Sequence, residues 1–571
     1  MNSLMKTSLL SQLILLLCVA HVISLKAQSL DNIGKEKPIA FSSGLNLQYG
    51  FYKAQDDGQA RQAPSSWVLS GSPTVSLYGI SIPFSFTISD QNQSFNQPFN
   101  RFGIAPQYKW IKLYAGWCNM NFSNYTFSGR QFLGVGLELN PGILRVGALY
   151  GRFQKAIRED SLAIRNANFV SNIPTPAFDR SGYAFKLGIG KTKSFLDFSY
   201  LRAKDDSNSI PIPEQTKISA AENAAFGINS QLTLFKHIVW KVDAGLSVYT
   251  RDLTADTAKI TSLPYQDIIK SIFLPRLSTQ VLIAGETSLS YRSTPFSLEL
   301  KYKRIDPDFK SMGCYYFQSD IEQYSVAPSF NIGKAVRVSG SIGLQNDNLY
   351  KKKLATTERV IGSANVSLNL GSKFGIDVNY SNFGITQSPG IRSLTDSTRL
   401  SQISESISVS PHLTFNGTEK TQSVFLFVAY NALAKRNPNI IYKSDNQSLS
   451  SNLGYSLSLQ KWQTNISANL NYTSTNSQAG ATKLIGVGGS LGKAFFEGKF
   501  NCNAGYNWYR NFFNDTSIGA SSSATLGASY ALFKNQSLSF QASILSNEST
   551  NQSVSKSFNE LYGTISYSLN F

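Results

Sequence analysis

Charge is scarce in this chain. Only 15% of its 571 residues are charged, whereas a typical soluble domain has about 25%. This argues against a coiled coil, an acidic disordered chain and a helical protein rich in Ala, Glu and Lys. Long apolar runs are missing too: after the N-terminus, no stretch approaches the roughly 18 apolar residues that a membrane-spanning helix needs. A helical membrane protein is therefore excluded.

The N-terminus carries the one long apolar run. Lys6 precedes an apolar stretch from Leu9 to Ile23, and Ala27 is a suitable cleavage point, which together predict a secretory signal peptide at residues 1–27. A lipoprotein anchored through Cys18 is disfavoured, because the preceding Leu17 is not small. We expect a short periplasmic N-terminal segment at 28–40 and a single domain at 41–571.

Histidine and cysteine are few after such cleavage. His237 and His412 remain, with Cys118, Cys314 and Cys502. An odd number of distant cysteines is no disulfide framework, although one bridge stays open. Two histidines are too few for a His-based metal cluster, so we expect neither a metal nor a cofactor.

The balance of charge is basic. Without residues 1–27, 51 Lys and Arg face 35 Asp and Glu, a net charge of +16. An exported chain rarely meets nucleic acid, so we expect no nucleic acid among its partners. An anionic lipid or polysaccharide surface, as in the outer membrane with its lipopolysaccharide, is favoured.

From about residue 41 the sequence alternates with a period of two. Leu453, Leu457, Ile466 and Leu470 fall on one face, and Asn469 falls on the other, among Ser, Asn and Gly. Such alternation predicts β-strands with one apolar and one polar face. The runs are longer than the 5–6 residues typical of a soluble sandwich. They have the length of membrane-crossing strands, whose sheet must close because lipid offers no hydrogen bonds.

Short and long connections alternate along the chain. Short ones fall near 140–142, 191–194, 235–237, 293–295, 332–335, 371–373, 416–421, 460–461, 493–495 and 533–535. Long ones fall between them, near 157–181, 204–221, 252–276, 306–321, 347–357, 384–401, 435–447, 475–480, 512–520 and 548–556. Outer-membrane barrels have short periplasmic turns and long outer loops. The predicted fold is an all-β, antiparallel transmembrane barrel of about 26 strands (24–26), roughly 50 Å across.

The last residues carry a resemblance to a known class. Ile565, Tyr567, Leu569 and Phe571 are apolar at alternate positions and end on an aromatic residue. This resembles the terminal strand of Gram-negative outer-membrane barrel proteins, which implies that the barrel-assembly machinery reads it. The segments 132–142 and 304–320 resemble uncharacterised large barrels. TonB-dependent transporters and lipopolysaccharide-assembly barrels are similar in the barrel, but each places a further domain before it, whereas strand signals begin near residue 41 in this chain.

The alternation of inward and outward side chains along each strand predicts which charged residues face the lumen. They are Glu138, Arg145, Asp197, Lys241, Asp243, Glu299, Lys301, Lys303, Arg337, Asp377, Glu497 and Lys499. As a pore lining they would tune selectivity. The simpler interpretation, which we call the plainer reading, is that these charges only keep the barrel wall solvated and form cross-strand pairs, such as Lys241 near Asp243. Because both signs are mixed, we favour the plainer reading.

Three segments interrupt the pattern. Asp306, Asp308, Asp320 and Glu322 could bind Ca²⁺, but their spacing matches no EF-hand loop, so a solvated outer loop is favoured. The run 351–353 is three lysines, which would suit lipopolysaccharide or a solvated tip. Segment 262–275 has helical spacing and would form a helix inside the lumen or on top of the barrel.

Function follows from these expectations. His412 should face the lumen without a nucleophile nearby in sequence, and the glycine-rich segments lie on strands, so no enzymatic activity is expected. We expect a channel or transport conduit whose lumen is partly occluded by inward loops or by a plug or surface partner protein. The alternative is a structural or secretion-related barrel that docks a lipoprotein, an adhesin or an export substrate.

Overall fold

The computed structural model describes residues 39–54, 62–77, 80–90, 103–159, 175–211, 217–258, 273–315, 318–390, 401–435, 445–550 and 557–570. The predicted signal peptide, residues 28–38, most of segment 262–275 and Phe571 lie outside this part. The described residues form strands and turns, and none of them belongs to a helix long and apolar enough to cross a membrane.

The strands follow one another along the chain with bounds that match the alternating runs of the sequence. They are β1 (Ile39–Ser42), β2 (Gly44–Ala54), β3 (Ser65–Gly71), β4 (Thr74–Leu77), β5 (Ile80–Ser89), β6 (Gly103–Ile104), β7 (Gln107–Tyr108), β8 (Ile111–Asn119), β9 (Phe127–Ser128), β10 (Gln131–Leu139), β11 (Leu144–Gln154), β12 (Asp179–Lys191), β13 (Ser194–Asp206), β14 (Glu222–Leu234), β15 (Ile238–Thr250), β16 (Thr279–Arg292), β17 (Phe296–Ile305), β18 (Gly313–Cys314), β19 (Ile321–Ile332), β20 (Val336–Asn346), β21 (Ala355–Leu370), β22 (Phe374–Pro389), β23 (Ser401–Asn416), β24 (Lys420–Lys435), β25 (Asn446–Leu459), β26 (Thr464–Ser477), β27 (Gly480–Phe495), β28 (Phe500–Phe513), β29 (Thr516–Phe533), β30 (Gln536–Ser549) and β31 (Phe558–Asn570).

All but two of these strands form one antiparallel sheet. The sheet has 29 strands, and β9 with β18 makes a separate two-stranded parallel pair. Three pairs of short strands, β1 with β2, β3 with β4 and β6 with β7, are each one strand interrupted by one or two residues. Counting each pair once leaves 26 strands among the described residues, the number that the sequence predicts.

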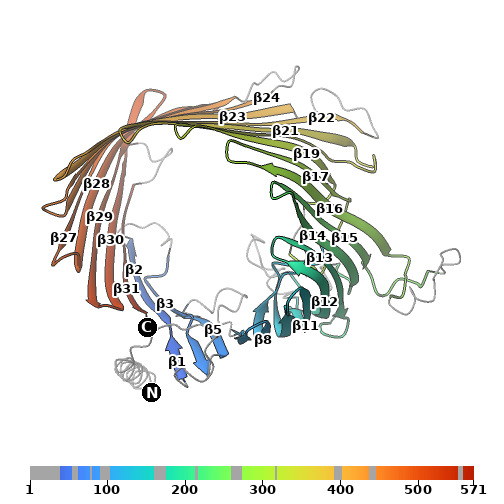
Figure 1. Cartoon of the computed structure of the whole chain (residues 1–571). Coiled ribbons are helices and arrows are strands. Elements are labelled where there is room, and N and C mark those ends of the chain that lie inside the picture. Colours follow the sequence, from blue (N-terminus) through green and yellow to red (C-terminus); the bar gives the residue numbers. More distant parts are fainter. Residues whose placement is uncertain are drawn as a thin grey trace.

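The pairings of this sheet connect into a ring. Eleven residues of β2 pair with β31, from Gly44 opposite Asn570 to Ala54 opposite Glu560. β3 continues to β5, β5 to β6 and β7, and those two to β8. Figure 1 shows the first strands, in blue, beside the last strands, in red. The predicted pairing of the first and last strands is thereby confirmed, and an even number of strands brings both ends of the sheet to the same rim.

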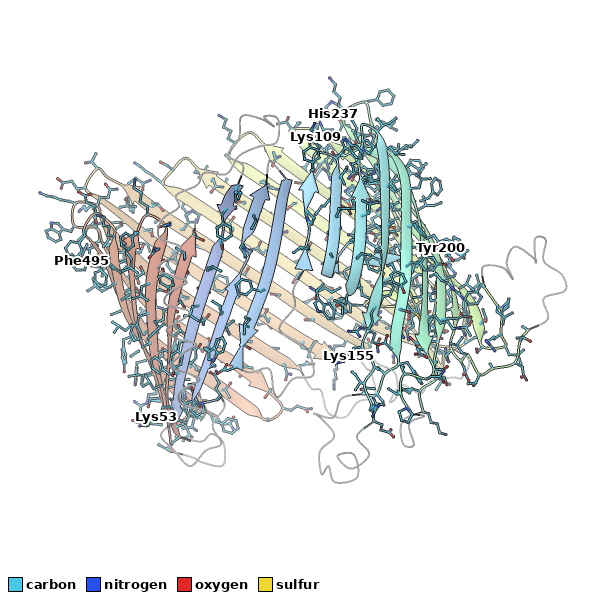
Figure 2. All side chains as sticks on the ribbon, turned by 90° about the horizontal axis from the view of Figure 1, so that it is seen from below. Lys53, Lys109, Lys155, Tyr200, His237 and Phe495 are labelled. Atoms are coloured by element: carbon cyan, nitrogen blue, oxygen red, sulfur yellow. The ribbon has the colours of Figure 1, made fainter. Side chains whose placement is uncertain are left out.

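The connections separate the rims as predicted, with two exceptions. Figure 2 shows Lys109 and His237, from short turns, at one rim, and Lys53 and Lys155 at the other. The long loops expected near 475–480 and 512–520 are instead two-residue turns, 478–479 and 514–515. Asn514 and Asp515 have φ angles of 45° and 63°, the left-handed pair of a type I′ hairpin turn, which Asn and Asp tolerate.

The two faces of the sheet differ as the alternation predicts. Outward positions carry large apolar side chains that remain exposed: Leu187 and Val281 are 60% and 62% exposed, and Leu470 is 54% exposed. Inward positions on the same strands carry Lys186 and Asn469. Aromatic rings line the short-turn rim, where Phe296 packs at a tilt against Phe330 and Phe500 packs edge-on against Tyr530. An apolar outer belt with aromatic rings at its rim is the surface of a barrel that faces lipid.

Reversing the polarity of one outward position tests this assignment of faces. Leu470→Arg should destabilise the folded barrel by roughly 2–4 kcal/mol, because it buries a charge in hydrocarbon. Asn469→Arg, one residue away on the inner face, is the matched control and should be tolerated. The measurement is unfolding in urea from lipid vesicles. Equal losses at both positions would show that the faces are wrongly assigned.

Removing the closing strand tests the ring. Deleting 562–571 takes away most of the pairing of β31 with both β2 and β30, leaving backbone groups unpaired in lipid at several kcal/mol each. We expect the truncated chain to stay in the periplasm or be degraded, with no heat-modifiable band on a gel. A folded, detergent-resistant product in the outer membrane would contradict closure through β31.

Candidate functional site

Two loops from the long-loop rim fold back into the ring. The first, 120–130, joins β8 to β10, and the second lies between β17 and β19, where the structure describes residues 306–315 and 318–320. They meet through the parallel pairing of β9 with β18 and through Ser311, which donates a hydrogen bond to the Thr126 carbonyl at 2.6 Å. We call the pair the inner loops.

Polar side chains of the wall hold the inner loops in place. Asp243 on β15 accepts hydrogen bonds from the Ser123 hydroxyl at 2.6 Å and from the Asn124 backbone N–H at 3.0 Å. Asn223 on β14 accepts one from the Met312 backbone N–H at 3.0 Å. Because these groups are buried together, each bond also avoids the cost of an unpaired polar atom. The loops are therefore fixed to the wall at several separate points.

Apolar side chains fill the space between the inner loops and the wall. Phe127 is fully buried, and its ring lies 5.8 Å from Phe132 and 5.4 Å from Phe153 between ring centres. Tyr125 packs edge-on against Phe309. This core lies inside the ring, on the inner face of the sheet. The barrel thus has a second hydrophobic layer between β8 and β19, which the alternation alone does not predict.

Glycines on the inner face make room for the loops. A Cβ on Gly227 would lie 2.6 Å from Thr126 Cγ2, one on Gly245 would lie 2.6 Å from Tyr125 Cβ, and one on Gly147 would lie 2.7 Å from Phe122 Cε1. Such distances are shorter than real Cβ contacts. These three glycines, and Gly136 in the segment 132–142 next to Met120, therefore leave room for loop side chains.

The loop with the clustered carboxylates is not the solvated outer loop that we expected. Asp306 and Asp320 are buried, and Phe309 and Met312 are buried between them in sequence. Asp306 accepts the Ile283 backbone N–H, and Asp320 accepts those of Asn348 and Leu349. The apolar residues draw the loop into the ring, and the carboxylates fix its ends. Among the described residues, no group of three or more His, Cys, Asp or Glu could hold a metal ion.

The charges predicted to line the lumen separate into three groups. Seven surround or lie beside the inner loops: Glu138, Arg145, Asp197, Lys241, Asp243, Glu299 and Lys301. Lys303 lies further along β17, and Arg337 and Asp377 lie on β20 and β22. Glu497 and Lys499 lie in the turn 496–499 at the rim, because β27 ends at Phe495. His412 lies on β23 next to Gly375 of β22.

Ion pairs on this wall differ from those expected. Arg145 holds Asp197 with two hydrogen bonds of 2.7 and 2.8 Å, and Lys301 pairs with Glu286 at 2.9 Å. Asp243 is occupied by the inner loop instead of by Lys241. Cys118, Cys314 and Cys502 are free thiols, so the bridge left open by the sequence does not form.

A polar cavity of about 290 Å³ lies between the inner loop and the wall. Its lining comes from β13 to β17 and from the loop residue Asn124, and includes Asn229, Gln231, Lys241, Asp243, Glu286, Glu299 and Lys301. Carboxylates, ammonium groups and amides converge there, so the cavity suits a small polar molecule. Five charged side chains line it: Lys241, Asp243, Glu286, Glu299 and Lys301.

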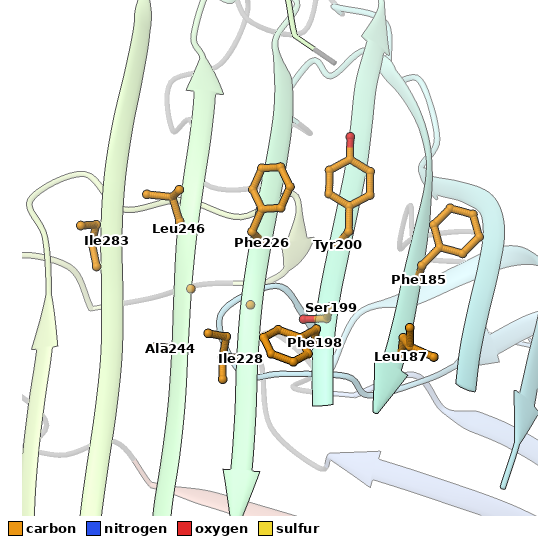
Figure 3. Close-up of a pocket in the computed structure, with 12 residues that line it drawn as sticks. Phe185, Leu187, Phe198, Ser199, Tyr200, Phe226, Ile228, Ala244, Leu246 and Ile283 are labelled. Atoms are coloured by element: carbon orange, nitrogen blue, oxygen red, sulfur yellow. The ribbon is translucent and has the colours of Figure 1, made fainter. Parts of the chain in front are cut away.

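The larger cavity nearby has a different character. It is a groove of about 550 Å³ on the outer face. Figure 3 shows Phe185, Phe198, Phe226, Leu246 and Ile283 around it. These side chains point outward, and its lining is almost wholly apolar. Such a groove suits acyl chains of surrounding lipid and offers no set of polar groups to orient a solute.

Comparison with known proteins adds little to this picture. No protein-family model matches the chain, and no curated protein does. Among solved structures, the outer membrane protein opdK from Pseudomonas aeruginosa is 8% identical, with 68% of this chain and 99% of that chain covered and a TM-score of 0.31. A BenF-like porin from Pseudomonas fluorescens Pf-5 is 11% identical, with 68% and 98% covered and a TM-score of 0.30. OccAB2 from Acinetobacter baumannii is 9% identical, with 66% and 96% covered and a TM-score of 0.31. Similarity of this size carries no argument about function, which rests on the residues of this chain.

Replacing one of these glycines by a larger residue tests the contact between the inner loop and the wall. Gly227→Val should lower stability by about 1–3 kcal/mol, because the added methyl groups meet Thr126 and Ser199. Gly343→Val on β20 is the control: a Cβ there has its nearest neighbour at 3.5 Å, an ordinary contact. The midpoint temperature of the heat-modifiable gel shift reports the difference. Equal midpoints for the two variants would show that the inner loop does not press on β14.

Lys353 forms an ion pair with Asp320, which we call the clamp. The strength of this clamp should depend on pH. Burial alone raises the pKa of Asp320, but hydrogen bonds from Lys353, Leu349 and Asn348 outweigh it and lower the pKa below its ordinary value of 3.8. A lowered pKa means that the clamp stabilises the loop above about pH 4 and is lost as the pH falls through the folded-state value. Protection of the 347–354 loop, followed by hydrogen exchange, should therefore be constant from pH 7 to 5.

The matched variant for this clamp is Asp320→Asn. It should show weak protection of the 347–354 loop already at pH 7, with little further change on acidification. Protection that falls steadily between pH 7 and 5 in the original chain would mean that another group controls this loop.

Proposed function

We propose that this chain is an integral outer-membrane β-barrel that acts as a channel for small solutes and has no enzymatic activity. The observation that carries the proposal is a ring of paired strands whose outward face is apolar and whose inward face is polar and charged. Such a ring needs lipid outside and tolerates water inside. Outer-membrane lipids and the barrel-assembly machinery are the partners that this placement implies, and the end of the chain with Ile565, Tyr567, Leu569 and Phe571 would carry the assembly signal.

Partial occlusion by the chain itself belongs to the proposal. A barrel of 26 strands would leak if it were empty, and its inner loops bring a buried core into the ring between β8 and β19. Support comes from the number of anchors, which include Asp243, Asn223 and Arg130; Arg130 donates hydrogen bonds to the carbonyls of Phe153 and Cys314. Loops held so firmly would narrow a permanent pore more than they would open and close it.

Conductance across a planar lipid bilayer tests the channel. The full chain should give steady single-channel steps, and deletion of 121–129 should enlarge them because the first inner loop is lost. Gly227→Val, which only displaces that loop, is the second variant in case the deletion does not assemble. Silence of the original chain, with a lipoprotein, adhesin or export substrate that co-purifies, would favour a scaffold in place of a channel.

Orientation in the membrane follows from the rims. A peptide tag inserted between Lys351 and Lys352, on the exposed tip of the loop 347–354, should bind antibody on intact cells, because this loop joins strands at the rim opposite the short turns. A tag between Lys236 and His237, in a short turn, should bind only after permeabilisation. The opposite result for both tags would invert the barrel.

A further inference from the structure

The polar cavity on the lumen wall contains two charges that the protein leaves uncompensated. Asp243 is held by Ser123 and Asn124, and Glu286 is paired with Lys301. Among the described residues, the side chains of Lys241 and Glu299 make no hydrogen bond and no ion pair, yet both line this cavity. One free ammonium and one free carboxylate thus face the same partly open cavity.

The register places these two groups at a distance that a small molecule can bridge. Lys241 on β15 lies opposite Ser288 of β16, and Glu299 on β17 lies opposite Ser290 of the same strand. Their backbones are thus two strand spacings apart across the sheet, about 10 Å, and two residues apart along it, about 7 Å, which together give about 12 Å. Both side chains point to the inner face, where a lysine stem of four carbons and a glutamate stem of two can approach a ligand from opposite sides.

The neighbouring charges disfavour ions of a single sign. A simple anion near Lys241 would also meet Asp243, Glu286 and Glu299, and a simple cation near Glu299 would also meet Lys241 and Lys301. A molecule with its own ammonium and carboxylate, set a few ångströms apart, meets attraction at both ends. The amides of Asn229 and Gln231 add donors and acceptors for a polar centre between them.

We propose that this cavity is a binding site for small zwitterions of the amino-acid or dipeptide class, with the solute's carboxylate on Lys241 and its ammonium on Glu299. The inference rests on the proposed channel function, for which it names the class of solute. A site of moderate affinity on the lumen wall would raise the local concentration of such solutes beside the inner loop, and would still release them.

Isothermal titration of the full chain in detergent tests the site. The probe is glycylglycine, with acetate and methylammonium as single-charge comparisons. Glycylglycine should bind at least tenfold more tightly than either. Lys241→Gln and Glu299→Gln should each weaken it about tenfold, because each removes one of the two attractive charges. Arg337→Gln and Asp377→Asn, lumen-facing charges on β20 and β22 outside the cavity, are the matched controls and should leave binding unchanged.

Each result decides one of the two proposals. Acetate or methylammonium that binds as tightly as glycylglycine, or equal losses in the controls, overturns the zwitterion site. Absence of glycylglycine binding in a chain that still gives steady conductance overturns the site and leaves the channel. Binding that depends on Lys241 and Glu299 in a chain without conductance supports the site and refutes the channel.

Discussion

The structure depends on the need to pair every backbone N–H and C=O in a surrounding that offers no water. A sheet with free edges would leave two rows of unpaired groups, and the pairing of β2 with β31 removes both. The even number of strands in the described sheet follows from that closure, and so does the position of Ile39 and Asn570 at one rim. Successive side chains of a strand point to opposite faces. When every second position is apolar and faces lipid, the positions between them face the lumen and can be polar.

Inside a barrel this wide, the side chains of opposite walls are too far apart to pack against each other. In the described residues, an apolar core fills the inside on one part of the wall only. The three clusters of buried apolar residues that the structure describes lie between Cys118 and Ile321, and the inner loops contribute Phe122, Phe127, Phe309 and Met312 to them. Because the loops bring their own apolar core, the wall needs glycine and alanine at the contacts and keeps its charges for the cavity beside them.

The period of two is a local property, so it was readable from the sequence. It predicts the strands, both faces, the count of 26 and most turns, including 235–237 and 371–373. The turn 514–515 is shorter than the loop predicted at 512–520, because Asn514 and Asp515 adopt the left-handed conformation that closes a two-residue hairpin. The inner loops were missed for a deeper reason: contacts such as Ser123 with Asp243 join residues 120 positions apart, and no spacing along the chain announces them. The large apolar and aromatic residues Met120, Phe122, Tyr125 and Phe127 in a connection between strands are the available signal.

The one-sided lining divides the wall into two regions with different freedom to change. Between β10 and β17, inner positions such as Gly227 and Gly245 are in contact with loop atoms, so a larger side chain there displaces a neighbour. On β20 to β30, a Cβ added at an inner glycine meets side chains of the wall itself, as at Gly375 beside His412, or nothing closer than 3.5 Å, as at Gly343. Substitutions can therefore accumulate on the second region and alter the bore while the first region keeps its shape. A chain built in this way can change the width and charge of its bore without changing the region that holds the inner loops.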